Sequence, residues 1–272
     1  MSLRIQTNVE AFNAHRQLQM SANNMAKSME RLSSGYRINR AADDAAGLAI
    51  SQKMEAQIGG LDQAQRNAGD AVSLVQTAEG ALSEVHSMLQ RVRDLAVQFN
   101  NGTLSTTDKA AITLEVTQLS AEISRIASQT QFNGIALLTG GNSITFQVGA
   151  SDGETLSISG RSLFGSGSSF DVNSDIFSFS GTVTLASIDD AIDKVSTARA
   201  TFGSVQNRLE HTLNTLSSYE ENLTASESRI KDVDMASEMV QFTKFQILQQ
   251  AGTSMLAQAN SAPQSVLSLL RG

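Results

Sequence analysis

The sequence predicts a mainly α-helical fold: a long antiparallel, coiled-coil-like rod with paired N- and C-terminal helices and a small β-hairpin insert. Three observations lead to this prediction. The chain has 272 residues and a single proline, Pro263, so nearly all of it is free to be helical. Apolar residues recur in steps of three and four along most of the chain. Nine of the 19 glycines lie between residues 133 and 187, which sets this segment apart from the helices.

The longest predicted helix runs from Asp44 to Asn100. Two apolar series repeat every seven residues within it and alternate in steps of three and four, as in a coiled coil. The two series are Leu61, Ala68, Val75, Leu82, Leu89 and Ala96, and Ala64, Ala71, Ala78, Val85, Val92 and Phe99. Asp43 and Asp44 supply an N-cap, and the glycine of Asn100–Gly102 ends the helix. At about 1.5 Å per residue, such a helix is roughly 84 Å long.

Two more amphipathic segments follow, over about 106–129 and 188–228. The first has its seam at Ile112, Val116, Leu119, Ile123 and Ile126. The second has its seam at Ile188, Ala191, Val195, Ala198, Phe202, Val205, Leu209, Leu216, Tyr219 and Leu223, interrupted only by Thr212. Because helices with such seams are unstable alone, we expect the three to pack side by side as an antiparallel bundle.

The glycine-rich segment between them predicts β-structure. Ile144, Phe146 and Val148 alternate with polar residues, an Asp152-Gly153 turn follows, and Leu156 and Ile158 alternate again. This pattern is typical of a β-hairpin. A second hairpin is suggested by Phe177, Phe179, Gly181, Val183 and Leu185.

Both ends of the chain are amphipathic, and we expect them to pair. The apolar seam that would support assembly comprises Leu18, Met25, Met29, Leu32, Val240, Ile247, Ala251 and Met255. Breaks are expected at 33–42 and 229–232. The predicted organisation is a terminal-helix domain (1–42 plus 229–272), a helical rod (43–132 plus 188–228) and a β-rich insert (133–187). Pro263 predicts a kink or local break, with helix continuing to about Leu270.

The last helix also carries a polar, uncharged stripe. It comprises Ser254, Gln258, Ser261, Ser265 and Ser268. No charged residue occurs between Lys244 and Leu270. One interpretation is a weakly solvated surface face. Because ordinary solvent-facing helices carry Lys and Glu, the other interpretation is a wet interior lined within an assembly. The terminal helices are too slight to form a core of their own, so we expect an obligate assembly.

Composition excludes several functions. The net charge of −7 argues against nucleic-acid binding, and no apolar stretch is long enough to span a membrane. The absence of cysteine excludes disulfides and thiolate metal sites. His15, His86 and His211 are scattered, without metal-ligand spacing, so we expect no catalytic, metal or cofactor site. No cleaved signal peptide is expected either.

Three segments resemble bacterial flagellins: Leu32–Ser51 (LSSGYRINRAADDAAGLAIS), Thr130–Gly134 (TQFNG) and the run from Arg229 to Leu270. The resemblance implies a filament subunit for swimming motility, not an enzyme, whose terminal helices form the inner tube of an open helical homopolymer. It implies extracellular localisation at the flagellum, after secretion by the flagellar type III export apparatus with an export chaperone and without a cleaved signal peptide. The other implied partners are the filament cap and junction proteins.

The resemblance also implies a receptor site. The stretch from Gln90 to Gln98 is similar to the one that host Toll-like receptor 5 contacts in the flagellins that it detects, and the matching positions are Arg91, Leu95 and Glu115. Leu95 lies outside the heptad series, so we expect it to be mildly exposed beside Arg91. The alternative for these residues is a packing contact between neighbouring subunits.

Two other functions share this architecture. A flagellar hook–filament junction protein has similar terminal helices and also assembles, but the long C-terminal match favours flagellin. A cytoplasmic coiled-coil adaptor would remain a monomer or a small oligomer. A flagellin carrying an inserted enzyme is disfavoured, because the insert is short and lacks a His-Glu-x-x-His motif.

Overall fold

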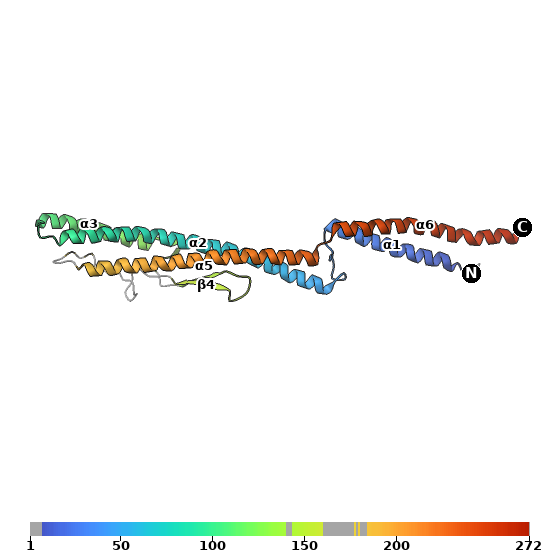
Figure 1. The fold of residues 1–272 in the computed structure, drawn as a ribbon, viewed down its shortest axis with the longest axis horizontal. Helices are drawn as coiled ribbons and strands as arrows, with labels where there is room; N and C mark the ends of the chain where they lie inside the picture. The colour runs from blue at the N-terminus through green and yellow to red at the C-terminus, as the bar shows by residue number, and fades with distance from the viewer. Residues whose placement is uncertain (1–6, 140–142, 160–176, 178, 180–183, 272) are drawn as a thin grey trace. The chain divides into compact units, whose positions relative to one another are not determined.

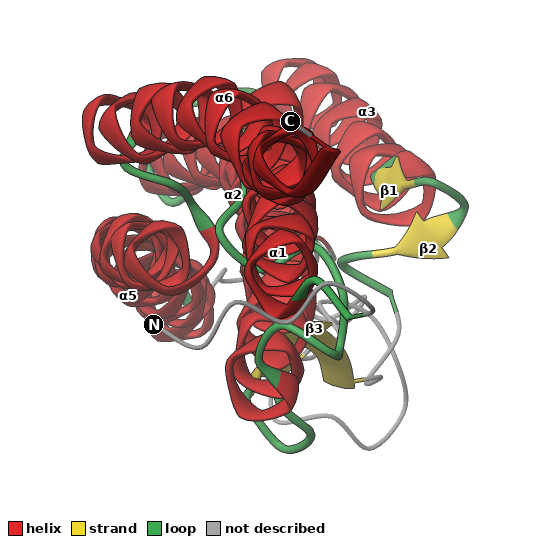
Figure 2. Cartoon of the chain, turned by 90° about the vertical axis from the view of Figure 1, so that its right-hand side faces the viewer, coloured by secondary structure: helices red, strands yellow, loops and turns green. Residues whose placement is uncertain are grey.

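The computed structural model describes residues 7–139, 143–159, 177, 179 and 184–271, except for the side chains of 159 and 262–271. Five helices and four short strands occur within this part (Figure 1). The helices are α1 (Val9–Ser34), α2 (Ala45–Phe99), α3 (Thr106–Gln129), α5 (Leu185–Lys231) and α6 (Met235–Arg271). The strands are β1 (Gln131–Phe132), β2 (Ile135–Ala136), β3 (Ser143–Gln147) and β4 (Thr155–Ser159). The mainly α prediction is confirmed, and Figure 2 shows how little strand accompanies the helices.

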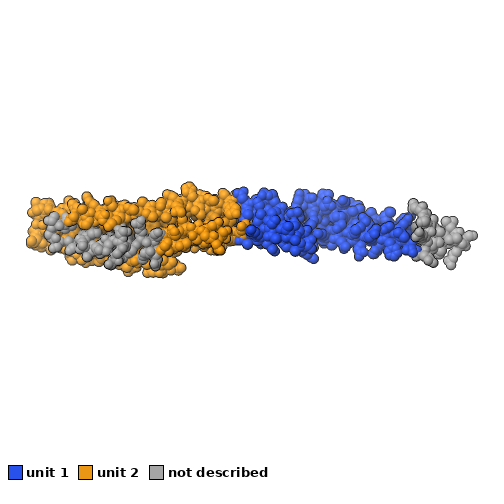
Figure 3. Space-filling model, turned by 90° about the horizontal axis from the view of Figure 1, so that it is seen from below, with its two compact units in different colours: residues 1–56, 222–272 blue, residues 57–221 orange. Residues whose placement is uncertain are grey.

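The chain divides into two compact units, coloured separately in Figure 3. Unit 1 comprises residues 1–56 and 222–272, and therefore contains α1, α6 and the adjoining ends of α2 and α5. Unit 2 comprises residues 57–221, with the rest of α2 and α5, all of α3 and the strands. Each unit thus brings together segments from distant parts of the sequence.

Within unit 2, α2 and α5 run antiparallel. Polar contacts between them occur in reverse order along the two helices: Gln65 with Glu220, Glu79 with Arg199 (3.3 Å) and Arg93 with Asp189 (2.6 Å). Helix α3 runs antiparallel to α2 as well, since Arg91 contacts Glu115 and the Lys109 ammonium lies 5.1 Å from the centre of the Phe99 ring. Both neighbours therefore pack along the same stretch of α2.

The apolar core of unit 2 follows the predicted seams. All twelve heptad residues of α2 are buried. On α3 the buried seam residues are Ile112, Val116 and Ile123, and on α5 they run from Ile188 to Leu216. Tyr219, which we predicted on the same seam, is half exposed, because the continuous apolar cluster ends on α5 near Leu209.

The buried face of α2 is wider than a two-position seam. A third apolar series, Leu74, Ala81, Met88 and Leu95, also repeats every seven residues and lies in or against the core. Because α2 packs against both α3 and α5, it needs this additional stripe. Leu95 is only 2% exposed, so the prediction that it is mildly exposed is wrong.

The predicted β-hairpin is present. Strands β3 and β4 pair antiparallel, with Ile144 opposite Ile158 and Phe146 opposite Leu156, and Gly153 adopts a left-handed φ of 89° in the turn. The suggested second hairpin lies mostly outside the described residues, but Leu185 is the first residue of α5 and not part of a strand.

A small hairpin that we did not predict joins β1 to β2. Asn133 and Gly134 between them both have positive φ, 49° and 79°. These values match the two-residue turn that an Asn-Gly pair favours. The dipeptide was therefore a usable hairpin signal in the sequence.

Helix ends follow the local chemistry of the sequence. The Asp44 Oδ1 accepts a hydrogen bond from the Gly47 amide (2.9 Å) at the start of α2, as predicted for an N-cap. Ser105 and Asp108 form a reciprocal capping box at the start of α3. At the other end of the chain, α6 continues through Pro263 to Arg271, so the helix extends to the predicted end near Leu270 and no break interrupts it.

The packing of α2 predicts a clear contrast between two leucines. Leu82 is fully buried, whereas Leu114 on α3 is 65% exposed. Replacing Leu82 by Ala leaves a cavity, so we expect the free energy of unfolding to fall by about 2–5 kcal/mol. Leu114→Ala is the control and should change it by about 0.5 kcal/mol or less. Urea unfolding followed by circular dichroism measures both, and equal effects would contradict this account of the core.

Candidate functional site

Helices α1 and α6 pack against each other in unit 1 (Figure 1). The Asn8 side-chain amide donates to the Ala259 carbonyl (2.7 Å), and the Arg31 guanidinium lies 3.6 Å from the Glu238 carboxylate. Between these contacts, a Cβ atom on Gly252 would approach the Leu18 side chain to 3.1 Å. The contacts occur in reverse order along the two helices, so the pair is antiparallel.

The pair leaves a broad apolar surface uncovered. Among the side chains that the structure describes, sixteen large apolar ones are exposed, and ten of these belong to α1 and α6. We call them the terminal apolar surface: Val9, Phe12, Met20, Met29, Met235, Met239, Val240, Ile247, Leu248 and Met255. An open groove on α6, lined by Met239, Val240, Thr243, Lys244 and Ile247, belongs to it. Exposed apolar surface of this extent indicates a contact with another molecule.

The eight residues of the predicted terminal seam fall on two kinds of surface. On α1, Leu18, Met25 and Leu32 are half-buried, whereas Met29 is 52% exposed. On α6, all four members are exposed: Val240, Ile247, Ala251 and Met255. The half-buried positions of α6 are instead Glu238, Phe242, Phe245, Gln249, Gly252, Leu256 and Ala259, which recur in steps of three and four. The α6 members of the seam are therefore available to other chains.

The polar stripe of α6 is exposed where the structure describes it. Ser254, Gln258 and Ser261 all lie in contact with solvent. The two serine hydroxyls donate to carbonyls of their own helix, those of Gln250 (3.1 Å) and Gln258 (2.9 Å). The side chains of Ser265 and Ser268 lie outside the described residues.

Two connecting segments join the terminal pair to the neighbouring helices. Gly35 ends α1 in a left-handed conformation with φ of 77°, and its amide donates to the Arg31 carbonyl (2.9 Å). The chain then pairs with the α5–α6 connection, where the Arg37 amide donates to the Lys231 carbonyl (2.7 Å) and the Val233 amide donates to the Gly35 carbonyl (2.9 Å). This short antiparallel pairing ties the two connections together inside unit 1.

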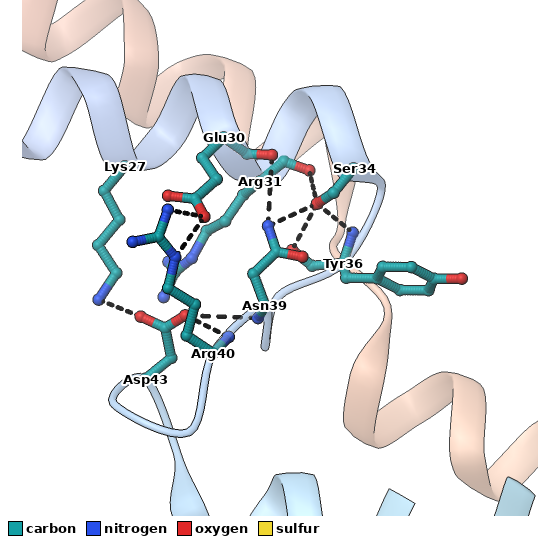
Figure 4. Close-up of polar contacts among 8 residues, drawn as sticks. All are labelled: Lys27, Glu30, Arg31, Ser34, Tyr36, Asn39, Arg40 and Asp43. Carbon is teal, nitrogen blue, oxygen red and sulfur yellow. Dashed lines mark hydrogen bonds and ion pairs between the residues drawn. The ribbon is translucent and has the colours of Figure 1, made fainter. Parts of the chain in front are cut away.

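Ion pairs hold the first connection against α1 (Figure 4). The Lys27 ammonium lies 2.6 Å from the Asp43 carboxylate, and the Arg40 guanidinium lies 2.9 Å from that of Glu30. The other Asp43 oxygen accepts hydrogen bonds from the amides of Asn39 (3.3 Å) and Arg40 (3.2 Å). The hydrogen bond with Lys27, together with those from the backbone, holds the pKa of Asp43 below its ordinary value.

Lys231 is the corresponding anchor at the end of α5. Its ammonium lies 3.1 Å from Glu55, 3.3 Å from Glu227 and 4.8 Å from the centre of the Tyr36 ring. Burial disfavours the charged form of Lys231, but the hydrogen bonds to the two carboxylates outweigh burial and raise its pKa. One cation thus links α2, α5 and the first connection within unit 1.

The sequence predicted a break at 33–42 and an N-cap role for Asp43, but not the ion pairs of this segment. Alternating charges at Lys27, Glu30, Arg40 and Asp43 flank Gly35. Such a pattern around a helix-ending glycine is compatible with a folded-back turn. Glu227 is four residues before Lys231 on the same helix, so that pair was a readable signal, whereas Glu55 could not be found because it lies 176 residues away in the sequence.

The three residues matched to receptor recognition lie on α2 and α3. The Arg91 guanidinium and the Glu115 carboxylate are 2.8 Å apart, and both side chains are about half exposed. Leu95 lies in the core of unit 2 and not on the surface. Only the charged pair can therefore meet another protein directly.

The described residues show neither a cluster of metal-ligating side chains nor a membrane span. Among them, no three His, Asp or Glu side chains converge as metal ligands would. No helix in this part of the chain is long and apolar enough to cross a bilayer.

Comparison with known proteins places the chain in one family. The bacterial flagellin N-terminal helical region matches residues 5–143, and the bacterial flagellin C-terminal helical region matches 185–270. Flagellin of Halalkalibacterium halodurans is 51% identical, over 98% of this chain and 99% of the relative. Flagellin of Bacillus subtilis is 47% identical, over 99% and 100%. The flagellar filament 33 kDa core protein of Treponema phagedenis is 47% identical, over 98% and 99%.

Paired terminal helices with an uncovered apolar surface define a structural protein that assembles with other chains. The chain belongs to the bacterial flagellin family, and it is a subunit of the flagellar filament that serves swimming motility. The three relatives are named as flagellins or filament core proteins, and none is a junction protein or an adaptor.

The ion pair of Asp43 predicts an acid-sensitive contribution to stability. Because the folded-state pKa of Asp43 is lowered, its contribution is present above the ordinary carboxyl pKa of about 3.9 and is lost as the pH falls through the folded value. We expect Asp43→Asn to reduce the free energy of unfolding by about 1 kcal/mol at pH 7. The difference from wild type should shrink at pH 2–3, as measured by urea unfolding. A difference that is the same at both pH values would contradict this role.

Proposed function

We propose that the terminal apolar surface forms the contacts between subunits in the inner tube of the filament. The observation that supports this proposal is the exposure of Val240, Ile247, Ala251 and Met255 on a helix whose other face already packs against α1. Such side chains contribute a stabilising free energy only when a second molecule removes them from water. An open helical polymer satisfies this need at every subunit, because each contact is head-to-tail and does not close.

The proposed domain boundaries fall at the two connecting segments, after α1 and after α5. Residues 1–42 and 229–272 form the inner-tube domain, residues 43–132 and 188–228 form the helical rod, and residues 133–187 form the variable β-rich insert. In support, α1 ends at Ser34, and a non-helical stretch separates α5 from α6 after Lys231. Breaks at these points let the terminal helices adopt contacts that the rod does not share.

The polar stripe of α6 has a proposed place in the same assembly. Ser254, Gln258, Ser261, Ser265 and Ser268 line the lumen of the tube. The uncharged character of the stripe supports this, because hydroxyl and amide groups keep water in a channel without concentrating ions of one sign. The exposure of Ser254, Gln258 and Ser261 in the single chain is compatible with a wetted surface.

Membership of the flagellin family also suggests partners other than further copies of this chain. The subunit is secreted to the cell exterior by the flagellar export apparatus, with an export chaperone and without a cleaved signal peptide, and it meets the filament cap and junction proteins there. The absence of cysteine supports export as an unfolded chain, because no disulfide has to be broken or formed. We infer no enzymatic activity and no cofactor.

Toll-like receptor 5 is the proposed host partner, through Arg91 and Glu115 with Leu95 as their support. The two charged side chains are exposed and paired, and Leu95 is buried in the same core that holds α2 against its neighbours. A contact between neighbouring subunits is the competing use of the same residues. The same residues can make both contacts, because the receptor would bind the free subunit and the neighbouring subunit would be contacted only in the filament.

The inner-tube proposal is tested by adding a charge to the terminal apolar surface. Ile247 is 62% exposed, so Ile247→Asp should leave the helical content of the monomer unchanged. In the filament the same carboxylate would be buried without a partner, and we expect the critical concentration for growth to rise by at least about tenfold. Sedimentation and electron microscopy of growing filaments measure this.

A matched control lies outside the terminal helices. Asn207 on α5 is exposed and polar, so Asn207→Asp adds the same charge at a position that does not belong to the terminal apolar surface. This variant should grow filaments at close to the wild-type critical concentration. Normal growth of Ile247→Asp would remove the basis for the inner-tube assignment.

The receptor proposal predicts a loss of affinity that depends on the charged pair. Arg91→Ala combined with Glu115→Ala should weaken binding of the monomer to the receptor ectodomain by about tenfold, without unfolding α2 or α3. Arg125→Ala removes an exposed, ion-paired arginine elsewhere on α3 and serves as the control. Unchanged affinity in the double variant, measured by surface plasmon resonance, would leave the subunit contact as the role of these residues.

A further inference from the structure

The exposed methionines of this chain gather on the terminal helices. Eight of the nine methionines lie within the described residues. Five of them are 46–64% exposed, and all five are on α1 or α6: Met20, Met29, Met235, Met239 and Met255. The other three, Met25, Met54 and Met88, are half-buried. Accessible thioethers in the described part of the molecule are thus confined to unit 1.

These five side chains make up half of the terminal apolar surface. Met239 also lines the groove on α6, beside Val240 and Ile247. Methionine is unbranched and polarizable, so it adapts its shape to a partner surface. The same thioether is readily oxidised where solvent reaches it.

We propose that these five methionines are a modification site for two-electron oxidants such as hydrogen peroxide, and that their oxidation reversibly prevents the free subunit from assembling. In the reaction, the thioether sulfur attacks one peroxide oxygen and the O–O bond breaks. An S–O bond forms, and the departing hydroxide takes up the proton of the attacked hydroxyl and leaves as water. Sulfur loses two electrons, and hydrogen peroxide is reduced to water.

The consequence for assembly follows from the polarity of the product. A sulfoxide carries a strong dipole and needs a hydrogen-bond donor or water. The groove around Met239 offers mainly apolar side chains, with Thr243 and Lys244 as its polar members. Burying five such groups between subunits therefore costs free energy that the unmodified thioethers do not. The fold of unit 1 is spared, because the five side chains already face solvent.

The inference rests on the proposed role of the terminal apolar surface, and its test begins with the full-length monomer. The monomer is treated with hydrogen peroxide, and each methionine is followed by peptide mass spectrometry. We expect the five exposed methionines to oxidise before Met54 and Met88. The critical concentration for filament growth should then rise by at least about tenfold, while circular dichroism stays unchanged. Methionine sulfoxide reductases of both stereospecificities should restore growth.

Two variants separate the exposed methionines from the others. One replaces all five exposed methionines by Leu, which preserves volume and helix propensity, and it should assemble equally well before and after peroxide. The other carries Met54→Leu and Met88→Leu, keeps the five, and should stay sensitive. If the variant with five Leu substitutions assembles poorly, the reductase treatment of the oxidised wild type shows whether methionine oxidation blocks growth.

The outcomes distinguish the inference from the proposed function. If the wild type assembles normally with sulfoxides at all five positions, the inference is overturned and the assembly surface stands. If growth is lost but neither reductase treatment nor the Leu variant restores it, oxidation elsewhere is responsible and the inference is again overturned. A charge at Ile247 that does not affect growth speaks against the assembly surface itself.

Discussion

Each helix of this protein needs a partner to bury its apolar residues, and the partner often comes from far along the chain. Helix α2 is covered by α5 and α3 in unit 2, and α1 is covered by α6 in unit 1. A single helix cannot form a core, so the two ends of the chain must meet before either is stable. In α2 this requirement extends to a third heptad stripe, because two helices pack on it.

The connections between the helices depend on the same pairing. Gly35, Arg37 and Val233 form backbone hydrogen bonds only because α1 ends where α6 begins. Lys231, Glu55 and Tyr36 then meet around one partly buried cation. These contacts are short-range, but residues 190 or more positions apart supply several of them. The connection is therefore a folded element with its own charge network.

What remains uncovered is as informative as what is buried. Helix α6 uses one face for α1 and keeps Val240, Ile247 and Met255 in water. Such a surface is unfavourable in a monomer and suits a subunit of a polymer. Methionine occupies half of the positions of the terminal apolar surface, which makes the interface adaptable and also exposes the free subunit to oxidation.

Local chemistry in the sequence by itself determined the helices, the cap at Asp44 and the β3–β4 hairpin, because periodicity and capping act over a few residues. It also predicted that the terminal helices pair. Only the tertiary structure decided which face each helix presents: Leu95 is buried because α2 has two partners, and Ile247 is exposed because α1 packs on the other side of α6. Burial depends on the neighbours of a side chain in space, and those come from contacts between residues distant in the sequence.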